Sequence, residues 1–334
     1  MKLCIRNLKK IPLTFLIIPG VAYSFTTQTL SDSLCFNTVE KKNSSNLYRV
    51  HRPLNYEYEG IQYFLHKNEF FSLNQNTAEK KSRFLVDENA IDFFVQEDSL
   101  WTLGEKLIER DLVTGKVKNR YPTGPKGVEK RTKAKGFHYL EGKVYIAHGS
   151  LGIVVFDLSD RKFNYVNSVN TKNSRGYISN AVSVSGDSPS NLFIAMSSWK
   201  KGFEGITVYD ASSNRVIHNM AYDKRNSGNV GPDAKIYHKG ESVFLNNGGW
   251  IHAFKTKNIL RYNSLKASWL PIVEEINISS HHGAPKKLKK YRMIKGDFIF
   301  ANNQILGCTV FKNKEEGFER PISKGKAVSF QLNH

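Results

Sequence analysis

The sequence repeats a pair of apolar strands about every 50 residues, and this repeat constrains the fold more than any other feature. Each copy has an apolar strand, a polar turn that contains glycine, and a second strand with alternating character. The clearest copies are residues 143–160 and 191–214, and weaker copies are residues 99–115, 242–258 and 297–314. Because the apolar period is two rather than 3.6, these units are sheets and not pairs of helices.

Such units cannot bury both faces of their sheets alone, so they are expected to pack radially around an axis. The repeat therefore predicts an all-β protein, a β-propeller of four-stranded antiparallel blades. The chain length favours six blades, with seven as the alternative, and residues 60–86 form one degenerate copy. Strands from both termini are expected to complete one blade and close the ring. Asp111, Asp157 and Asp210 each end a strand of a copy, where they are expected to accept backbone hydrogen bonds and form the next turn.

The first 24 residues have the pattern of a secretory signal peptide. A basic segment without acidic residues precedes a short apolar stretch that is interrupted by Pro12 and Pro19, and small residues follow. Cleavage is expected near Ser24, which leaves residues 25–334 as a single propeller domain. The protein is then exported, to the periplasm or the medium. No uninterrupted apolar run has the length of about 20 residues that a membrane span requires.

Two segments resemble known propeller repeats. VYIAHGSLGIVVFDLSD, residues 144–160, resembles the LVIVD-type repeat, and LFIAMSSWKKGFEGITVYDASSNRVI, residues 192–217, is similar to the YVTN-type repeat of bacterial extracytoplasmic propellers. The sequence departs from the pattern where Lys255 and Lys312 replace the turn aspartate. The resemblance implies a propeller outside the cytoplasm, but it implies no activity because the functions of these families are diverse.

The three cysteines are too few for a disulfide framework. Cleavage of the signal peptide removes Cys4 and leaves Cys35 and Cys308 near opposite ends of the mature chain. Closure of the ring would bring these ends into one blade or adjacent blades. In an oxidising compartment we therefore expect a disulfide between Cys35 and Cys308, the alternative being two buried free thiols.

Each expected innermost strand carries one polar residue at its second position, mostly between apolar neighbours. With a period of two, these polar side chains are predicted to line the central channel. The six residues are Gln62, Asp92, His138, Asn180, Lys235 and Arg292. Three potential cations and one carboxylate favour an anionic ligand, with Asp92 pairing to one of the cations. The alternative is that these residues are only the wet lining of any propeller channel.

The formal net charge is +19, and lysine-rich loops are expected to gather much of it at one mouth of the channel. The predicted rim residues are Lys133, Lys135, Trp199, Lys200, Lys201, Lys287 and Lys290. Their summed field would attract an anionic ligand, an acidic glycan or an acidic protein surface. Trp199 would suit a sugar ring or a partner surface. The alternative is that the lysines are merely solvated. The export signal argues against a nucleic acid as the partner.

No nucleophile elbow, phosphate-binding glycine loop or zinc-ligand spacing is present in the sequence, so we predict no metal and no cofactor. The favoured function is a monomeric binding module that engages an anionic ligand or partner through the basic channel face. One alternative is a lactonase-like or lyase-like enzyme, with His138 as the general base and Lys235 or Arg292 stabilising an oxyanion. Another is a scaffold for envelope proteins.

Overall fold

The computed structural model describes most of the chain between residues 54 and 261 and shorter segments outside that region. The described residues are 39–41, 48–50, 54–66, 68–73, 80–86, 89–127, 133–167, 180–197, 205–221, 230–232, 234–246, 250–261, 274–277, 291–301, 304–313, 321–322 and 329–331. In these segments no helix has the length and apolar character that a membrane span requires. The expected signal peptide lies outside the described residues.

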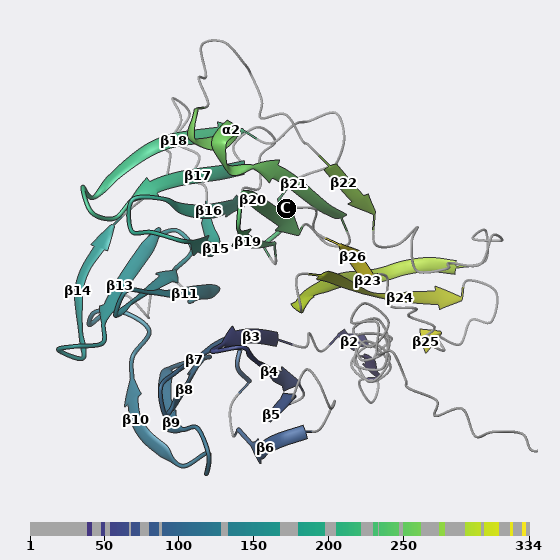
Figure 1. Cartoon of the computed structure of the whole chain (residues 1–334), viewed down its shortest axis with the longest axis horizontal. Coiled ribbons are helices and arrows are strands. Elements are labelled where there is room, and N and C mark those ends of the chain that lie inside the picture. Colours follow the sequence, from purple (N-terminus) through teal and green to yellow (C-terminus); the bar gives the residue numbers. More distant parts are fainter. Residues whose placement is uncertain are drawn as a thin grey trace, which may run out of the picture.

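The protein is a β-propeller, and five blades of four consecutive antiparallel strands are described (Figure 1). The first blade contains β3 (Leu54–Tyr58), β4 (Ile61–His66), β5 (Glu69–Leu73) and β6 (Lys80–Leu85). The second contains β7 (Asp92–Gln96), β8 (Ser99–Leu103), β9 (Leu107–Asp111) and β10 (Val117–Tyr121). The third contains β11 (Gly136–Leu140), β12 (Lys143–Ala147), β13 (Ile153–Asp157) and β14 (Lys162–Asn167).

The fourth and fifth blades have the same order, with the first strand nearest the axis and the fourth at the periphery (Figure 1). The fourth contains β15 (Asn180–Gly186), β16 (Leu192–Ser197), β17 (Gly205–Asp210) and β18 (Arg215–Ala221). The fifth contains β19 (Lys235–Lys239), β20 (Ser242–Asn246), β21 (Trp250–Lys255) and β22 (Glu274–Asn277), with the short helix α2 (Thr256–Leu260) after β21. The prediction of four-stranded antiparallel blades is confirmed.

A sixth sheet follows the five blades and differs from them. It contains β23 (Tyr291–Ala301), β24 (Gln304–Asn313), β25 (Pro321–Ile322) and β26 (Ser329–Gln331). β25 and β26 both pair with β24, so the sheet is three strands deep rather than four. The repeat copy at residues 297–314 was predicted to contain the second and third strands of a blade. In the structure these residues form the end of β23 and β24, which are the first and second strands of this sheet, so the prediction was wrong. The expected six or seven blades are not confirmed, since five complete blades are described.

The predicted closure of the ring by strands from both termini is not seen among the described strands. Each of the five described blades is made of consecutive strands, so none of them combines strands from both termini. The two short strands before the first blade, β1 (Val39–Lys41) and β2 (Tyr48–Val50), pair with each other. β23 contacts β3 and so brings the C-terminal sheet beside the first blade. Cys35 lies outside the described residues, and the predicted disulfide with Cys308 stays a prediction.

The apolar core is divided into layers between neighbouring blades, and the third blade is buried on both faces. In β12, Val144 and Ile146 pack toward the second blade, in a cluster with Trp101. The alternate residue, Tyr145, packs toward Ile194 of the fourth blade. A strand that is buried on both faces is apolar at successive positions. This explains why the second strand of each blade gave the clearest signal in the sequence.

The turn aspartates behave as predicted. Asp111 Oδ1 accepts hydrogen bonds from the backbone nitrogen atoms of Thr114 and Val113, at 2.7 and 3.2 Å. Asp157 accepts from the backbone and hydroxyl of Ser159, and Asp210 does the same with Ser213. Hydrogen bonds to the charged form lower the pKa of a carboxyl group, and the pKa of each of these three aspartates is lowered in this way.

These turns predict a specific pH dependence of stability. Because the folded-state pKa of each aspartate lies below its usual value, the turn contribution is present at neutral pH and is lost as the pH falls through the folded-state pKa. Between about pH 6 and about pH 3, urea unfolding should show a larger loss of stability for the wild type than for Asp111→Asn/Asp157→Asn/Asp210→Asn. Equal losses in the two proteins would contradict this account of the turns.

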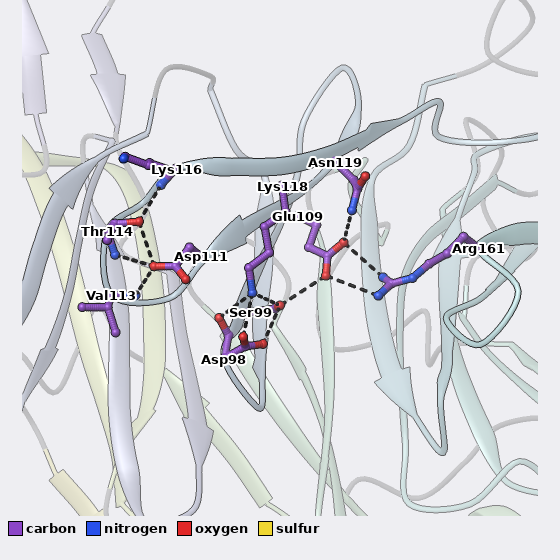
Figure 2. A network of polar contacts seen from close by, with 10 residues as sticks. All are labelled: Asp98, Ser99, Glu109, Asp111, Val113, Thr114, Lys116, Lys118, Asn119 and Arg161. Carbon is purple, nitrogen blue, oxygen red and sulfur yellow. Dashed lines mark hydrogen bonds and ion pairs between the residues drawn. The ribbon is translucent and has the colours of Figure 1, made fainter.

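A polar network joins the second and third blades (Figure 2). The carboxylate of Glu109, which is 5% exposed, accepts from both terminal nitrogen atoms of Arg161, at 3.2 and 3.4 Å. It also accepts from Asn119 at 2.8 Å and from Ser99 at 3.2 Å. The Arg161 guanidinium lies 5.1 Å from the centre of the Trp101 ring. Arg161 comes from the turn between β13 and β14 of the third blade, whereas Glu109 and Trp101 belong to the second. These contacts therefore stabilise the packing of the two blades against each other.

Candidate functional site

A cavity of about 210 Å³ lies in the central channel. It is lined by residues of β3, β7, β11, β15 and β19, the first strands of all five blades, and by Gln62 of β4. Its wall is mixed, with aromatic residues such as Tyr56, Tyr139 and Tyr237 beside charged and hydroxyl groups. The volume is below the range of about 300–1,000 Å³ that is typical of sites for drug-sized ligands. The cavity therefore suits a small molecule.

An ion pair crosses the channel at the end where the first strands begin. Lys235 Nζ of the fifth blade lies 3.3 Å from Asp92 Oδ2 of the second blade, although the third and fourth blades separate these two along the chain. The same ammonium group donates to the backbone oxygen of Lys135 at 3.4 Å. The Lys235 side chain is 11% exposed. A Cβ atom at Gly136 would lie 3.0 Å from Lys235 Nζ, so glycine leaves the space that the pair occupies.

A second ion pair lies toward the other end of the first strands. Lys239 Nζ of β19 is 3.4 Å from Glu57 Oε2 of β3, and both residues line the cavity. Within the described wall, the two lysines are balanced by two carboxylates. Among the residues that the structure describes, the cavity wall therefore shows no excess of positive charge, unlike the predicted ring of residues. Both contacts are longer than the roughly 2.7–2.9 Å of a strong charge-assisted hydrogen bond.

Several polar side chains of the channel bind the open backbone edge of the next blade. Asp92 Oδ2 accepts from Phe137 N at 3.2 Å. Ser183 and Ser185 of β15 accept from the backbone nitrogen atoms of Ile236 and His238 in β19, at 3.2 and 2.9 Å. The innermost strand of a blade has an unpaired edge, and buried backbone groups need hydrogen-bond partners. Asp92, Ser183 and Ser185 therefore have structural contacts that join neighbouring blades.

Two histidines border the cavity and are held by hydrogen bonds. His138 Nε2 lies 2.8 Å from the backbone oxygen of Gly186, to which it donates. Burial lowers the pKa of His138, and burial likewise lowers the pKa of His238, against an opposing effect of Asp187. In both residues the effect of burial favours the neutral imidazole. Among the described residues, no group of three or more His, Cys, Asp or Glu side chains is arranged to hold a metal ion.

Of the six predicted channel residues, four line the cavity: Gln62, Asp92, His138 and Lys235. Gln62 does so from a strand other than the predicted one, because Ile61–His66 is the second strand of its blade and β3 is the first. The two are joined by a tight turn in which Glu59 and Gly60 have φ of +49° and +72°.

The other two predicted channel residues have different outcomes. Asn180 is not among the residues that line the cavity, and Ser183 and Ser185 occupy that wall instead. A bulge between Ala181 and Ser183 shifts the register of β15, so the second-position rule fails there. Arg292 lies in β23, and its side chain is outside the described part of the structure.

The predicted basic rim is described only in part. Lys133 and Lys135 are exposed and precede β11, at the same end of the channel as the pair of Asp92 with Lys235. The remaining rim residues, Trp199, Lys200, Lys201, Lys287 and Lys290, lie outside the described residues. The role of the rim stays a prediction.

Several residues of the cavity wall were not predicted from the sequence, among them Glu57, His238 and Lys239. A signal for β3 was present: Glu-Gly follows an alternating strand at residues 59–60, as it does at residues 141–142 before β12. In both turns glutamate and glycine have positive φ, as a two-residue hairpin turn requires. This signal would have identified Leu54–Tyr58 as the innermost strand.

No protein-family model matches the sequence, and no curated protein matches it. The resemblance to LVIVD and YVTN repeats is therefore not confirmed. Among solved structures, the β-propeller domain of Cps50 (Swd1) from Myceliophteria thermophila is similar, with a TM-score of 0.52 and 13% identity over 88% of each chain. This likeness supports the propeller fold alone.

Two bacterial structures are more weakly similar. BamB from Moraxella catarrhalis has a TM-score of 0.47 and 10% identity, over 85% of this chain and 84% of BamB. PorZ, a surface component of the type-IX secretion system of Porphyromonas gingivalis, has a TM-score of 0.44 and 12% identity, over 84% of this chain and 33% of PorZ. At these values neither protein is a guide to the function of this one.

Proposed function

We propose that the protein is an exported β-propeller that binds a small polar ligand in its central channel. The observation that carries the proposal is the pair of Asp92 and Lys235, which come from blades far apart along the chain and meet in the wall of a cavity. A Lys ammonium has three donors, and the described contacts of Lys235 use two of them, both at more than 3.2 Å. A ligand with an acceptor group would complete this arrangement.

The same proposal includes export, a single domain of residues 25–334 and a disulfide between Cys35 and Cys308. These three features rest on the sequence pattern. The signal peptide of residues 1–24 would deliver the chain to an oxidising compartment. In that compartment a channel that is open to solvent can take up small molecules without a membrane-spanning segment.

An anionic ligand is the second candidate. It is favoured by Lys133 and Lys135, which are exposed at the end of the channel that holds Lys235. The balanced charges of the described residues in the cavity wall argue for a ligand without a net charge in the cavity itself. An acidic glycan or acidic protein surface would then contact the lysines at the mouth rather than the channel.

Lys235→Met should lower the affinity of the channel ligand by at least about tenfold, because a hydrogen bond to a charged group contributes about 1.5–3 kcal/mol. Native mass spectrometry of the protein purified from its own host would measure the fraction that carries a bound small molecule. The matched control is Lys118→Met, which removes a lysine paired with Asp98 at 2.9 Å away from the cavity. An unchanged ligand fraction in Lys235→Met, or a wild type without any bound molecule, would contradict the proposal.

A further inference from the structure

Gln62 is a buried polar side chain without a described partner. It is 2% exposed and lines the cavity, and neither Nε2 nor Oε1 of its amide has a hydrogen-bond partner in the described structure. A buried polar group that lacks a partner lowers the stability of the folded protein. Asp92, His138 and Lys235, the other predicted residues in this wall, all have hydrogen-bond partners. The amide of Gln62 can therefore form hydrogen bonds with a ligand without breaking a described hydrogen bond within the protein.

The register places the amide beside the second ion pair of the channel. Gln62 of β4 lies directly opposite Glu57 of β3, and residues that oppose each other in an antiparallel pair project from the same face of the sheet. The carboxylate of Glu57 is 3.4 Å from Lys239 Nζ. One part of the cavity wall thus combines an amide, a carboxylate and an ammonium group.

The chemistry of this wall selects the ligand. The Gln62 amide offers two donors at Nε2 and an acceptor at Oε1, so a group that only accepts, such as a carboxylate, leaves Oε1 without a partner. A group that only donates, such as an ammonium ion, leaves Nε2 without one. Hydroxyl groups donate and accept together. The equal numbers of lysines and carboxylates in the described part of the wall favour a ligand without net charge.

Part of the remaining wall is aromatic. Tyr56, Tyr139 and Tyr237 line the cavity together with the polar groups. An aromatic ring presents an apolar face that packs against C–H groups. A sugar ring combines C–H groups on its faces with hydroxyl groups around its edge, so it matches both parts of this wall.

We infer that the channel binds a small neutral saccharide and that the amide of Gln62 makes paired hydrogen bonds with its hydroxyl groups. The inference rests on the proposed function and names its ligand class. Asp92 and Lys235 would contact other hydroxyl groups at the opposite end of the cavity. The volume of about 210 Å³ limits the ligand to one sugar ring or little more.

Ligand-observed NMR of the full chain tests this inference with a panel of single compounds. The neutral sugars are glucose, galactose and N-acetylglucosamine, and the comparison compounds are glucuronate, alanine and acetamide. At least one neutral sugar should give saturation transfer, and Gln62→Met should weaken its binding by at least about tenfold. Methionine keeps the length of the side chain and removes its polar atoms. The matched control, Gln96→Met, changes a glutamine of β7 that does not line the cavity.

Thermal unfolding separates loss of binding from loss of folding. Without a ligand, Gln62→Met should unfold at a temperature equal to or above that of the wild type, because the variant no longer buries an amide without partners. Binding of glucuronate, alanine or acetamide with no binding of a neutral sugar would overturn the inference while the channel remained a binding site. Absence of binding by every compound would overturn it as well, as would unchanged sugar affinity in Gln62→Met.

Discussion

Trp101→Ala is expected to lower the free energy of unfolding by about 3–5 kcal/mol, the usual cost of truncating a buried tryptophan. Trp101 is 1% exposed and stacks on Phe94 of its own blade with 5.8 Å between the ring centres. Its ring also meets Phe156 of the third blade at 6.3 Å. Because the Arg161 guanidinium lies over the same ring, the cavity left by alanine would also loosen the polar network around Glu109.

Urea unfolding measures this loss, and two variants serve as controls. Trp101→Phe keeps an aromatic ring against Phe94 and should cost less than Trp101→Ala. Val113→Ala shortens a side chain that is 74% exposed and should change stability by no more than about 0.5 kcal/mol. A loss below about 1 kcal/mol for Trp101→Ala would mean that this interblade layer contributes little to stability.

Asp92→Ala is expected to have the second largest effect, a loss of about 2–3 kcal/mol. The substitution leaves the nearly buried ammonium of Lys235 without its carboxylate and the backbone nitrogen of Phe137 without its acceptor. Removing one partner of a fully buried pair costs more, but the Asp92 side chain is 26% exposed, so water would compensate part of the loss.

A double-mutant cycle tests the origin of this effect. Lys235→Met alone should cost less than Asp92→Ala, because Asp92 would keep its hydrogen bond from Phe137. Asp92→Ala/Lys235→Met should be more stable than the sum of the single losses predicts, since the unpaired ammonium is then absent. Strict additivity of the two free energy changes would show that the residues do not interact in solution.

The fold could be predicted from the sequence where both faces of a strand are buried. Residues such as Val144 and Tyr145 alternate between two interblade layers, and this gives the apolar runs from which the blades were recognised. Turns with side-chain acceptors, such as that of Asp157, could also be predicted from the sequence, because their hydrogen bonds are local. The C-terminal sheet was misjudged because β24 pairs with both β25 and β26, a choice of partners that no local pattern contains.

The candidate site was harder to predict because its polar residues interact across the ring. A period of two indicates that Asp92 and Lys235 can point inward, but their contact depends on the positions of blades that are distant in the sequence. Local irregularities also matter: the bulge at Ala181 moved the predicted position from Asn180 to the serines that follow. The pairing of Glu57 with Lys239, two other residues of the described cavity wall, has the same nonlocal origin.

The most direct test of channel binding is a crystal structure of the protein as purified from its own host, without added ligand. The proposed function predicts non-protein electron density in the cavity between the first strands of the blades, within hydrogen-bond distance of Lys235 Nζ and the Gln62 amide. A channel that holds only separate ordered water molecules on these groups would contradict the proposal.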